Sequence, residues 1–287
     1  MPAKPLLPAL LAPGLLLGLG SADPAAAARV RAASTAVTVD YGIMLAGVPI
    51  GTAQMNGAIN GAQYKMDVTA RLTGLVGAIT GGYGSGRASG QVAGAGRPVP
   101  GSFAVASHSS STSITVRMAL ARGNVVASEI VPPLVVDPER VPLDAAAKRA
   151  VVDPVSALLM PARRQGDLTD PENCNRVIPV FDGASRFDVI LSYGETRRVE
   201  KPGYAGPVLV CNARYRPIAG HRPDKPGVKF MEENTDMSVW LAPVEGARVL
   251  LPLRISVRTM LGTNIIEATR WTQTGAGATT AQAAVAQ

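Results

Sequence analysis

The chain is poor in the residues that carry most metal and acid–base chemistry. Only 4% of its 287 residues are aromatic, and it contains two cysteines and two histidines. Two cysteines are too few for a zinc finger or a ferredoxin-like cluster, and two histidines without close spacing make a poor metal site. The sequence also lacks a G-x-S-x-G elbow, an H-E-x-x-H motif, a phosphate-binding loop and a G-x-G-x-x-G turn ahead of a helix. We therefore expect a protein that is not an enzyme and that holds neither a cofactor nor a metal ion.

The composition excludes a fibre and a wholly disordered chain. Of the residues, 47% are apolar and 17% are charged, and the 30 glycines and 23 prolines do not gather in low-complexity runs. A chain of this length buries roughly 70–75% of its unfolded surface, so it can fold without a metal or a dense disulfide framework.

Residues 1–28 have the pattern of a secretory signal. Lys4 precedes the apolar stretch LLPALLAPGLLLGLG, and small residues follow, so cleavage after Ala22 or within Ala26–Ala28 fits. A membrane anchor is the alternative, but Pro8 and Pro13 interrupt the stretch, which is shorter than the ~20 residues of a membrane span. No cysteine follows the signal as a lipid attachment site. The sequence predicts a soluble, exported protein that does not span the membrane.

Export changes the interpretation of Cys174 and Cys211. In an oxidising compartment, an even pair of cysteines most simply forms a disulfide. The alternative is a reactive thiol or a redox couple, which usually has a close C-x-x-C spacing that this chain lacks. We predict a structural bridge between the two residues.

The exported part of the chain is mainly β in its pattern. Apolar residues alternate with small or polar ones, which is the period of a half-buried strand. The predicted strands are Val37–Leu45, Tyr64–Arg71, Thr112–Leu120, Val125–Val131, Val177–Phe181, Arg186–Tyr193, Val208–Tyr215, Ser238–Leu241, Arg248–Val257 and Ile265–Thr272. Many short strands separated by glycine-bearing turns indicate an antiparallel curved sheet or open half-barrel with one or two short helices.

Helix signals are few. Gly74–Ile79 forms one possible turn, Asp144–Arg149 a possible second helix, and Asp153–Met160 the clearest helix, with Asp153 as N-cap and Pro161 as its stop. We expect a single β-rich domain over residues 29–272, with two sheet halves joined near 131–161. A disordered tail is expected over 273–287 because that segment is small and polar.

Positive charge is concentrated in the first half of the chain. The net charge of the chain is +7. The segment Tyr41–Ser128 contains six basic residues and only one acidic residue, Asp67. This excess is consistent with an anionic envelope partner such as phospholipid or lipopolysaccharide, but ordinary solvated strand faces are the preferred interpretation. Nucleic acid is not an expected partner, because the protein is exported and no basic–aromatic motif accompanies the charge.

Three further segments have a functional and a plain structural interpretation. The carboxylates Glu232, Glu233 and Asp236 could serve a glycosidase or bind calcium, but they lie in a stretch whose surroundings predict a solvated loop. The glycine-rich stretch GGYGSGRASG lacks the lysine of a phosphate loop, so it predicts a flexible turn. His108 lies among serines and His221 in a proline-rich loop, and neither is expected to form a catalytic triad.

Several segments together resemble a known family. They are YGIMLAGVPIGTAQM, DPVSALL, CNRVIPVFDGASRFDV, CNARYRPIAGH, MSVWLAP and VLLPLRISVRTMLGTNIIEA. They resemble an uncharacterised bacterial envelope family catalogued as a domain of unknown function (number three thousand one hundred and eight), in its alphaproteobacterial form, over about Thr38–Trp271. The resemblance implies a periplasmic, β-rich protein. By loose analogy of fold, it is similar to the open half-barrels that carry lipoproteins or lipids across the periplasm.

We predict a non-enzymatic protein of envelope maintenance that binds a lipid, a lipoprotein or another amphiphile in an apolar groove of the curved sheet. The candidate groove-lining residues are Phe181, Trp240, Trp271, Leu158 and Leu159, although strand aromatics are more often core than ligand platform. One alternative is a structural protein that docks onto an outer-membrane or cell-wall protein complex. A second alternative is an exported hydrolase of unfamiliar design.

Overall fold

The structure is a computed structural model that describes residues 34–92, 97–135, 137–163 and 165–275. The predicted signal sequence, residues 1–28, lies outside this range, as does most of the predicted tail. Residues 273–275 of that tail are the end of the last strand.

The protein is mainly β, as its alternating pattern predicts. The strands of the first half are β1 (Ser34–Leu45), β2 (Val48–Asn60), β3 (Gln63–Leu72), β4 (Tyr83–Val92), β5 (Pro98–His108), β6 (Ser113–Ala121) and β7 (Asn124–Val131). The strands of the second half are β8 (Met160–Pro161), β9 (Arg176–Phe181), β10 (Arg186–Lys201), β11 (Tyr204–Ala219), β12 (Met237–Val244), β13 (Val249–Thr259) and β14 (Gly262–Gly275). The helical elements are α1 (Gly74–Thr80), η2 (Ser156–Leu158), η3 (Pro171–Asn173) and α2 (Pro226–Glu233).

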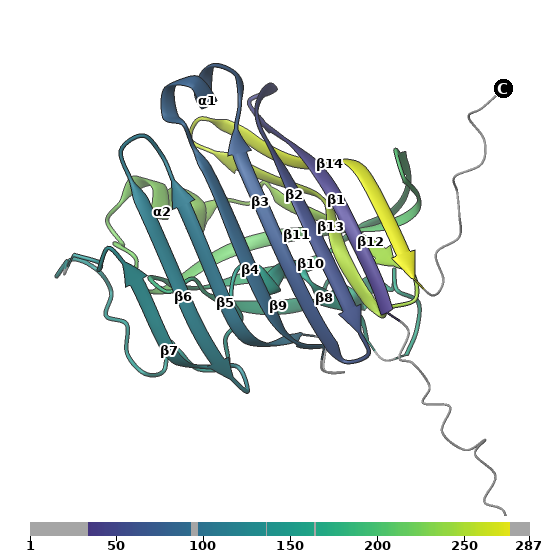
Figure 1. Cartoon of the computed structure of the whole chain (residues 1–287), viewed down its shortest axis with the longest axis horizontal. Helices are drawn as coiled ribbons and strands as arrows, with labels where there is room; N and C mark the ends of the chain where they lie inside the picture. The colour runs from purple at the N-terminus through teal and green to yellow at the C-terminus, as the bar shows by residue number, and fades with distance from the viewer. Residues whose placement is uncertain (1–33, 93–96, 136, 164, 276–287) are drawn as a thin grey trace, which may run out of the picture. The chain divides into compact units, whose positions relative to one another are not determined.

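One antiparallel sheet contains all of these strands. Its order runs from β7 through β6, β5, β4, β3, β2 and β1 to β14, and then through β13, β12, β11 and β10 to β9. The first and last strands therefore pair in the middle of the sheet, with Val39 opposite Trp271. The sheet is not closed, because β7 and β9 are its edges. Figure 1 shows β1–β7 in front and strands of the second half behind them.

The segment before η2 joins the two edges of the sheet by backbone hydrogen bonds. On one side, Val125 N–H donates to Lys148 C=O at 3.0 Å and Val151 N–H donates to Gly123 C=O at 2.7 Å. On the other side, Val152 forms a parallel bridge to Val180 of β9. The unpaired groups of two edge strands are thereby partly satisfied without closing the barrel.

Two apolar cores hold the sheet together. In the larger core, inward side chains of β1–β6 pack against residues of the second half, including Phe181, Leu253 and Trp271. The smaller core surrounds the cysteines and includes Leu209 and Leu241. Because Val208 belongs to the larger core and Leu209 to the smaller one, both faces of β11 are buried along this stretch.

The predicted helices need correction. Asp153–Met160 contains only the short η2, because Met160 and Pro161 pair as β8 with Leu250 and Val249 of β13. Asp144–Arg149 forms turns, held by Ala147 N–H donating to Asp144 Oδ1 at 2.8 Å. The helix α2 lies where the sequence predicts a loop; Pro226 occupies its first turn, where the missing N–H costs nothing.

The sequence pattern does not predict strands β2, β4 and β5, because small residues dilute their alternation. The prediction of a flexible turn for GGYGSGRASG is wrong, because residues 83–90 of this stretch belong to β4. There, glycine is needed for space: a Cβ on Gly86 would lie 2.9 Å from Val155 Cγ2, and one on Gly90 would lie 2.3 Å from Val99 C=O. Crowding by neighbours, which the local sequence does not record, explains these glycines.

Candidate functional site

An apolar cavity of about 300 Å³ lies in the second half of the sheet. Its lining is almost entirely hydrocarbon, and it is partly open to the surface. The lining residues are Pro154, Ala157, Leu158, Met160, Ile178, Val180, Phe187, Val189, Leu191, Ala213, Arg214, Tyr215, Met231, Met237, Ser238, Val239, Pro252, Ile255, Ser256 and Val257.

Strand alternation places these side chains on one face. Phe187, Val189 and Leu191 are every second residue of β10, and their neighbours across the strand pair include Tyr215 and Ala213 of β11. The Phe187 and Tyr215 rings are in contact, with centroids 5.3 Å apart. The pattern in the predicted strands Arg186–Tyr193 and Val208–Tyr215 contained this information, but only the fold shows which face borders a cavity.

The opposite face of the same strand pair is polar and tightly paired. Asp188 is buried, and its two carboxylate oxygens accept hydrogen bonds from Arg186 at 2.6 Å and from Arg216 at 2.5 Å. Because Asp188 lies between Phe187 and Val189, this pairing holds the two cavity residues in place.

A buried polar network fixes the η2 wall of the cavity. Asp153 Oδ1 accepts hydrogen bonds from the N–H groups of Val155 and Ser156, and Asp153 Oδ2 accepts one from Ser156 Oγ at 2.5 Å. Ser156 Oγ in turn contacts Tyr64 Oη of β3 at 2.6 Å. Burial raises the pKa of Asp153 above its ordinary value, although these hydrogen bonds oppose the shift. The network connects Ala157 and Leu158 of the cavity wall to the first half of the sheet.

One charged residue, Arg214, borders the cavity, but its side chain lies on the other face of β11. Arg214 is one of its lining residues and is exposed. Among the residues that the structure describes, Arg214 forms no ion pair. Because Arg214 lies between Ala213 and Tyr215, whose side chains line the cavity, strand alternation places the Arg214 side chain on the polar face that carries Arg216.

The predicted groove residues are divided between the cavity and the core. Leu158 lines the cavity. Leu159, Phe181 and Trp271 are instead buried in the larger core, where Trp271 contacts the Tyr204 ring at 5.4 Å. These side chains point toward the first half of the sheet, and their size fills the space between the two halves.

Trp240 lies in a different environment, between two cations. The guanidinium of Arg197 is 4.8 Å from its ring centroid and that of Arg254 is 5.2 Å from it. Arg254 also pairs with Glu267 at 3.0 Å, and Lys201 pairs with Glu267 at 2.8 Å. The Trp240 ring is thus part of a paired cation cluster rather than of the cavity wall.

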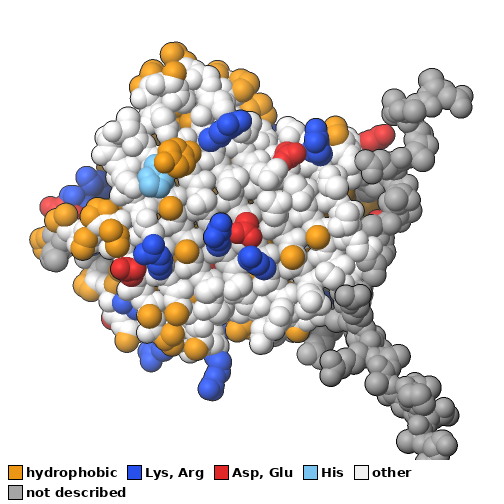
Figure 2. Space-filling model, in the orientation of Figure 1, with side chains coloured by type: hydrophobic (Ala, Val, Ile, Leu, Met, Phe, Trp, Pro, Cys, Tyr) orange, Lys and Arg blue, Asp and Glu red, His pale blue; other side chains and the backbone are white. Residues whose placement is uncertain are grey.

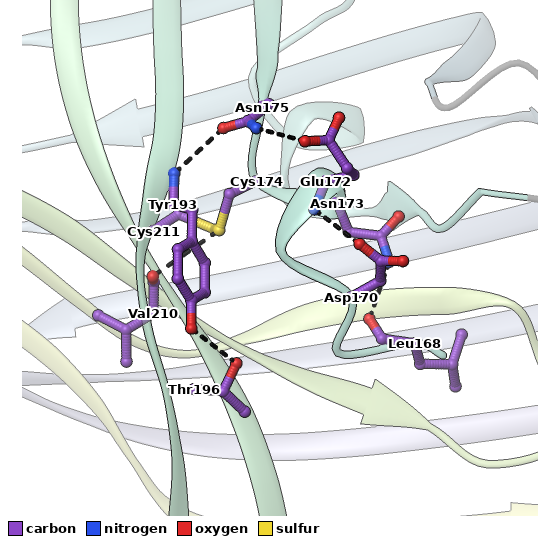
Figure 3. The surroundings of a disulfide bond; sticks show 10 residues. All are labelled: Leu168, Asp170, Glu172, Asn173, Cys174, Asn175, Tyr193, Thr196, Val210 and Cys211. Atoms are coloured by element: carbon purple, nitrogen blue, oxygen red, sulfur yellow. Dashed lines mark hydrogen bonds between the residues drawn. A yellow bond between two sulfur atoms is a disulfide. The ribbon is translucent and has the colours of Figure 1, made fainter. Parts of the chain in front are cut away.

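The predicted disulfide is present. Cys174 and Cys211 are bonded, with Cα atoms 5.4 Å apart (Figure 3). The bond attaches the segment that ends with η3 to β11, two residues before Ala213 of the cavity. On the chain-entropy estimate for 37 residues of separation, it stabilises the fold by roughly 4 kcal/mol. Such bonds persist in oxidising compartments, which is consistent with a location outside the cytoplasm.

The other candidate residues, His108, His221, Glu232, Glu233 and Asp236, do not line the cavity. His108 Nδ1 and Ser113 Oγ are 2.8 Å apart, and the His108 ring stacks on Tyr83. Glu232 and Glu233 are exposed at the end of α2, and Asp236 is exposed beyond it. Within the described ranges, no group of three or more His, Cys, Asp and Glu is arranged to hold a metal ion. In the same ranges, no helix has both the length and the apolar character needed to cross a bilayer.

Comparisons with known proteins identify a family but no activity. None of the curated proteins compared with the chain matches it. One solved structure with some likeness is that of a "putative lipoprotein" from Parabacteroides distasonis, with 8% identity, a TM-score of 0.35, and coverage of 82% of this chain and 94% of that one. At that TM-score the likeness supports no argument about this chain. Residues 37–269 match the family described as "Protein of unknown function (DUF3108)", so the chain belongs to the DUF3108 family.

Proposed function

We propose that this protein is a non-enzymatic, periplasmic binding protein that holds the acyl chain of a lipid or another amphiphile in the cavity beside η2. The observation that carries the proposal is the cavity itself, which has a nearly pure hydrocarbon lining and an opening to the surface. A soluble chain rarely leaves such a space unless it accommodates an apolar group. The predicted signal sequence and the disulfide support the periplasmic location.

The size of the cavity restricts the ligand. Pockets for small ligands range from about 300 to 1,000 Å³, and this cavity of about 300 Å³ is at the lower limit. One thin apolar chain fits this space better than the two chains of a phospholipid. Each methylene group removed from water contributes about 0.8 kcal/mol, so the chain supplies most of the binding energy.

Calorimetric titration with dodecanoic acid tests the proposal. We expect wild-type protein to bind it with a negative heat-capacity change, the sign of buried apolar surface. Ala213→Phe places a ring in the cavity and should weaken binding about tenfold or more. Ala205→Phe, at an exposed position of the same strand, is the matched control and should bind as the wild type does.

A second comparison separates the head group from the chain. Dodecanol, which has the same chain and no charge, should bind about as tightly as dodecanoic acid, because the cavity lining is almost entirely hydrocarbon. Wild-type protein that binds neither ligand, or binding that Ala213→Phe leaves unchanged, would exclude the cavity as the binding site.

A further inference from the structure

Among the segments of the chain that carry no charged residue, three contain a turn or helix at one end of the sheet. They are residues 41–64, between Asp40 and Lys65; residues 72–86, between Arg71 and Arg87; and residues 259–266, between Arg258 and Glu267. The first contains the β1–β2 turn, the second contains α1, and the third contains the β13–β14 turn.

The fold brings the three segments to one end of the sheet. Ala46 N–H, in the β1–β2 turn, donates to Thr263 C=O of β14 at 2.9 Å. Thr73 N–H, just before α1, donates to Ile50 C=O of β2 at 2.9 Å. In Figure 1 this end carries α1 and the neighbouring hairpin turns, and Figure 2 shows hydrophobic side chains gathered there. We call this end the apolar tip and define it by Val48, Leu75, Ile79, Met260 and Leu261.

The apolar tip exposes large side chains that the cores do not use. Leu75 is 77% exposed, Ile79 is 68% exposed and Leu261 is 79% exposed. Leu75 and Ile79 are four residues apart on α1, so they share a face, and no residue of α1 is buried. Contiguous exposed apolar groups of this kind on a monomer mark an interaction surface.

Basic residues lie directly behind the tip. Arg71 is the penultimate residue of β3, Arg258 precedes the β13–β14 turn, and both are exposed. The acid Asp236 adjoins Arg258, whose backbone N–H donates to the Asp236 C=O at 3.0 Å. Tyr83, which is exposed, pairs across the strands with Arg71. An uncharged tip with cations and an amphipathic ring behind it is complementary to the hydrocarbon boundary and anionic head groups of a bilayer.

We propose that the apolar tip docks on the surface of an anionic phospholipid bilayer, with Leu75, Ile79 and Leu261 inserted at the head-group boundary and Arg71 and Arg258 at the level of the phosphates. The inference does not require the cavity to bind a ligand. The two sites are nevertheless adjacent along one hairpin, because Val257 of the cavity precedes Met260 of the tip by three residues. Docking would thus place the cavity close to a source of amphiphiles.

The test places a fluorescent probe at the tip of the full chain. Leu261→Trp is mixed with vesicles of phosphatidylcholine and phosphatidylglycerol in a 3:1 ratio, and its emission is compared with that of wild type to subtract Trp240 and Trp271. We expect a blue shift and quenching by brominated acyl chains, since the added ring enters the bilayer boundary. Val126→Trp, at a 65% exposed position of β7, is the matched control and should show neither effect. Because the probe is at position 261, its emission reports on the tip even if another part of the full chain binds vesicles.

Vesicle flotation measures the contribution of each part. Removal of Leu75 and Leu261 by serine substitution should lower the vesicle-bound fraction about tenfold or more for each leucine. Arg71→Gln and Arg258→Gln should each lower it about fivefold, and only when phosphatidylglycerol is present. These side chains are exposed, so thermal unfolding should be unchanged. Fluorescence of Leu261→Trp that brominated acyl chains do not quench would overturn the proposal. The proposal would also fail if wild type did not bind vesicles but self-associated, and if the serine substitutions of Leu75 and Leu261 abolished that self-association. Neither result would affect binding of dodecanoic acid, which tests the cavity separately.

Discussion

At the scale of single residues, the carboxylate of Asp153 is held by several hydrogen bonds at once. It is fully buried, and its oxygens accept hydrogen bonds from two backbone N–H groups and the Ser156 hydroxyl. A buried charge needs such partners, and removing them would leave the carboxylate unpaired in a medium of low dielectric constant. Asp153 therefore decides where η2 and the cavity wall lie.

The raised pKa of Asp153 has a consequence for stability. A carboxyl group with a higher pKa in the folded than in the unfolded chain binds its proton more tightly when the chain is folded. Its contribution to the free energy of unfolding is therefore fully present below the pKa of the unfolded chain, 3.8, and is lost as pH rises through the pKa of the folded chain. We expect the free energy of unfolding of wild type to fall relative to Asp153→Asn as pH rises above 3.8. Chemical denaturation across this range measures the difference.

Tyr64→Phe is the control for that prediction. It removes the hydrogen bond to Ser156 Oγ but adds or removes no group that titrates in this range, so it should cost about 1 kcal/mol at every pH. If the curves of the free energy of unfolding against pH were parallel for wild type and Asp153→Asn, the pKa of Asp153 would be the same in the folded and unfolded chains.

At the scale of elements, β4 shows how packing against neighbours selects residues that local propensity disfavours. Glycine weakens an isolated strand, yet β4 contains it at positions 84, 86 and 90. At Gly90 a side chain would meet Val99 C=O at 2.3 Å and Tyr64 Oη at 2.9 Å, beside the register shift between Ser89 and Gly90. The backbone of β5 thus lies so close to β4 that a residue with a side chain at position 90 would collide with it.

Two alanine substitutions test this explanation. Gly90→Ala should lower the free energy of unfolding by about 1–3 kcal/mol, because the backbone of β5 cannot move without cost. Gly57→Ala in β2 is the matched control; its Cβ would have only Val37 C=O nearby, at 4.0 Å, so it should be neutral or stabilising by about 0.5–1 kcal/mol. Equal effects of the two changes in thermal or urea unfolding would refute the packing explanation.

At the scale of the whole molecule, the segment around Val151 and Val152 is the connection that keeps an unclosed sheet from having two free edges. Val152 N–H donates to Pro179 C=O at 2.8 Å, and Val152 C=O accepts from Phe181 N–H at 2.9 Å. Together with the bonds of Val125 and Val151, these contacts bind β9 and the β6–β7 turn to the same short segment. Unpaired edges favour aggregation, so the connection also protects the folded chain from edge-to-edge pairing.

Amide hydrogen exchange tests the connection. We expect the N–H groups of Val125, Val151, Val152 and Phe181 to exchange slowly, as central strands do, because each donates to a backbone carbonyl. The Leu75 amide, in the first turn of α1 where intrahelical acceptors are lacking, serves as the fast reference. Exchange at the four positions as fast as at Leu75 would mean that the edges open freely.

The sequence by itself determined the strands with clear alternation, such as Val37–Leu45, and the disulfide between Cys174 and Cys211. Both follow from local period or from a count of residues, which need no knowledge of distant neighbours. The tertiary structure decided which apolar faces meet. It placed Phe181 and Trp271 in a filled core and Phe187 and Tyr215 at a cavity, although all four look alike as strand aromatics. It also brought three uncharged turns together at one end, because β1 pairs with β14, more than 200 residues away along the chain. Pairing between the two ends of a chain depends on the summed packing of the whole sheet, and no short stretch of sequence carries that information.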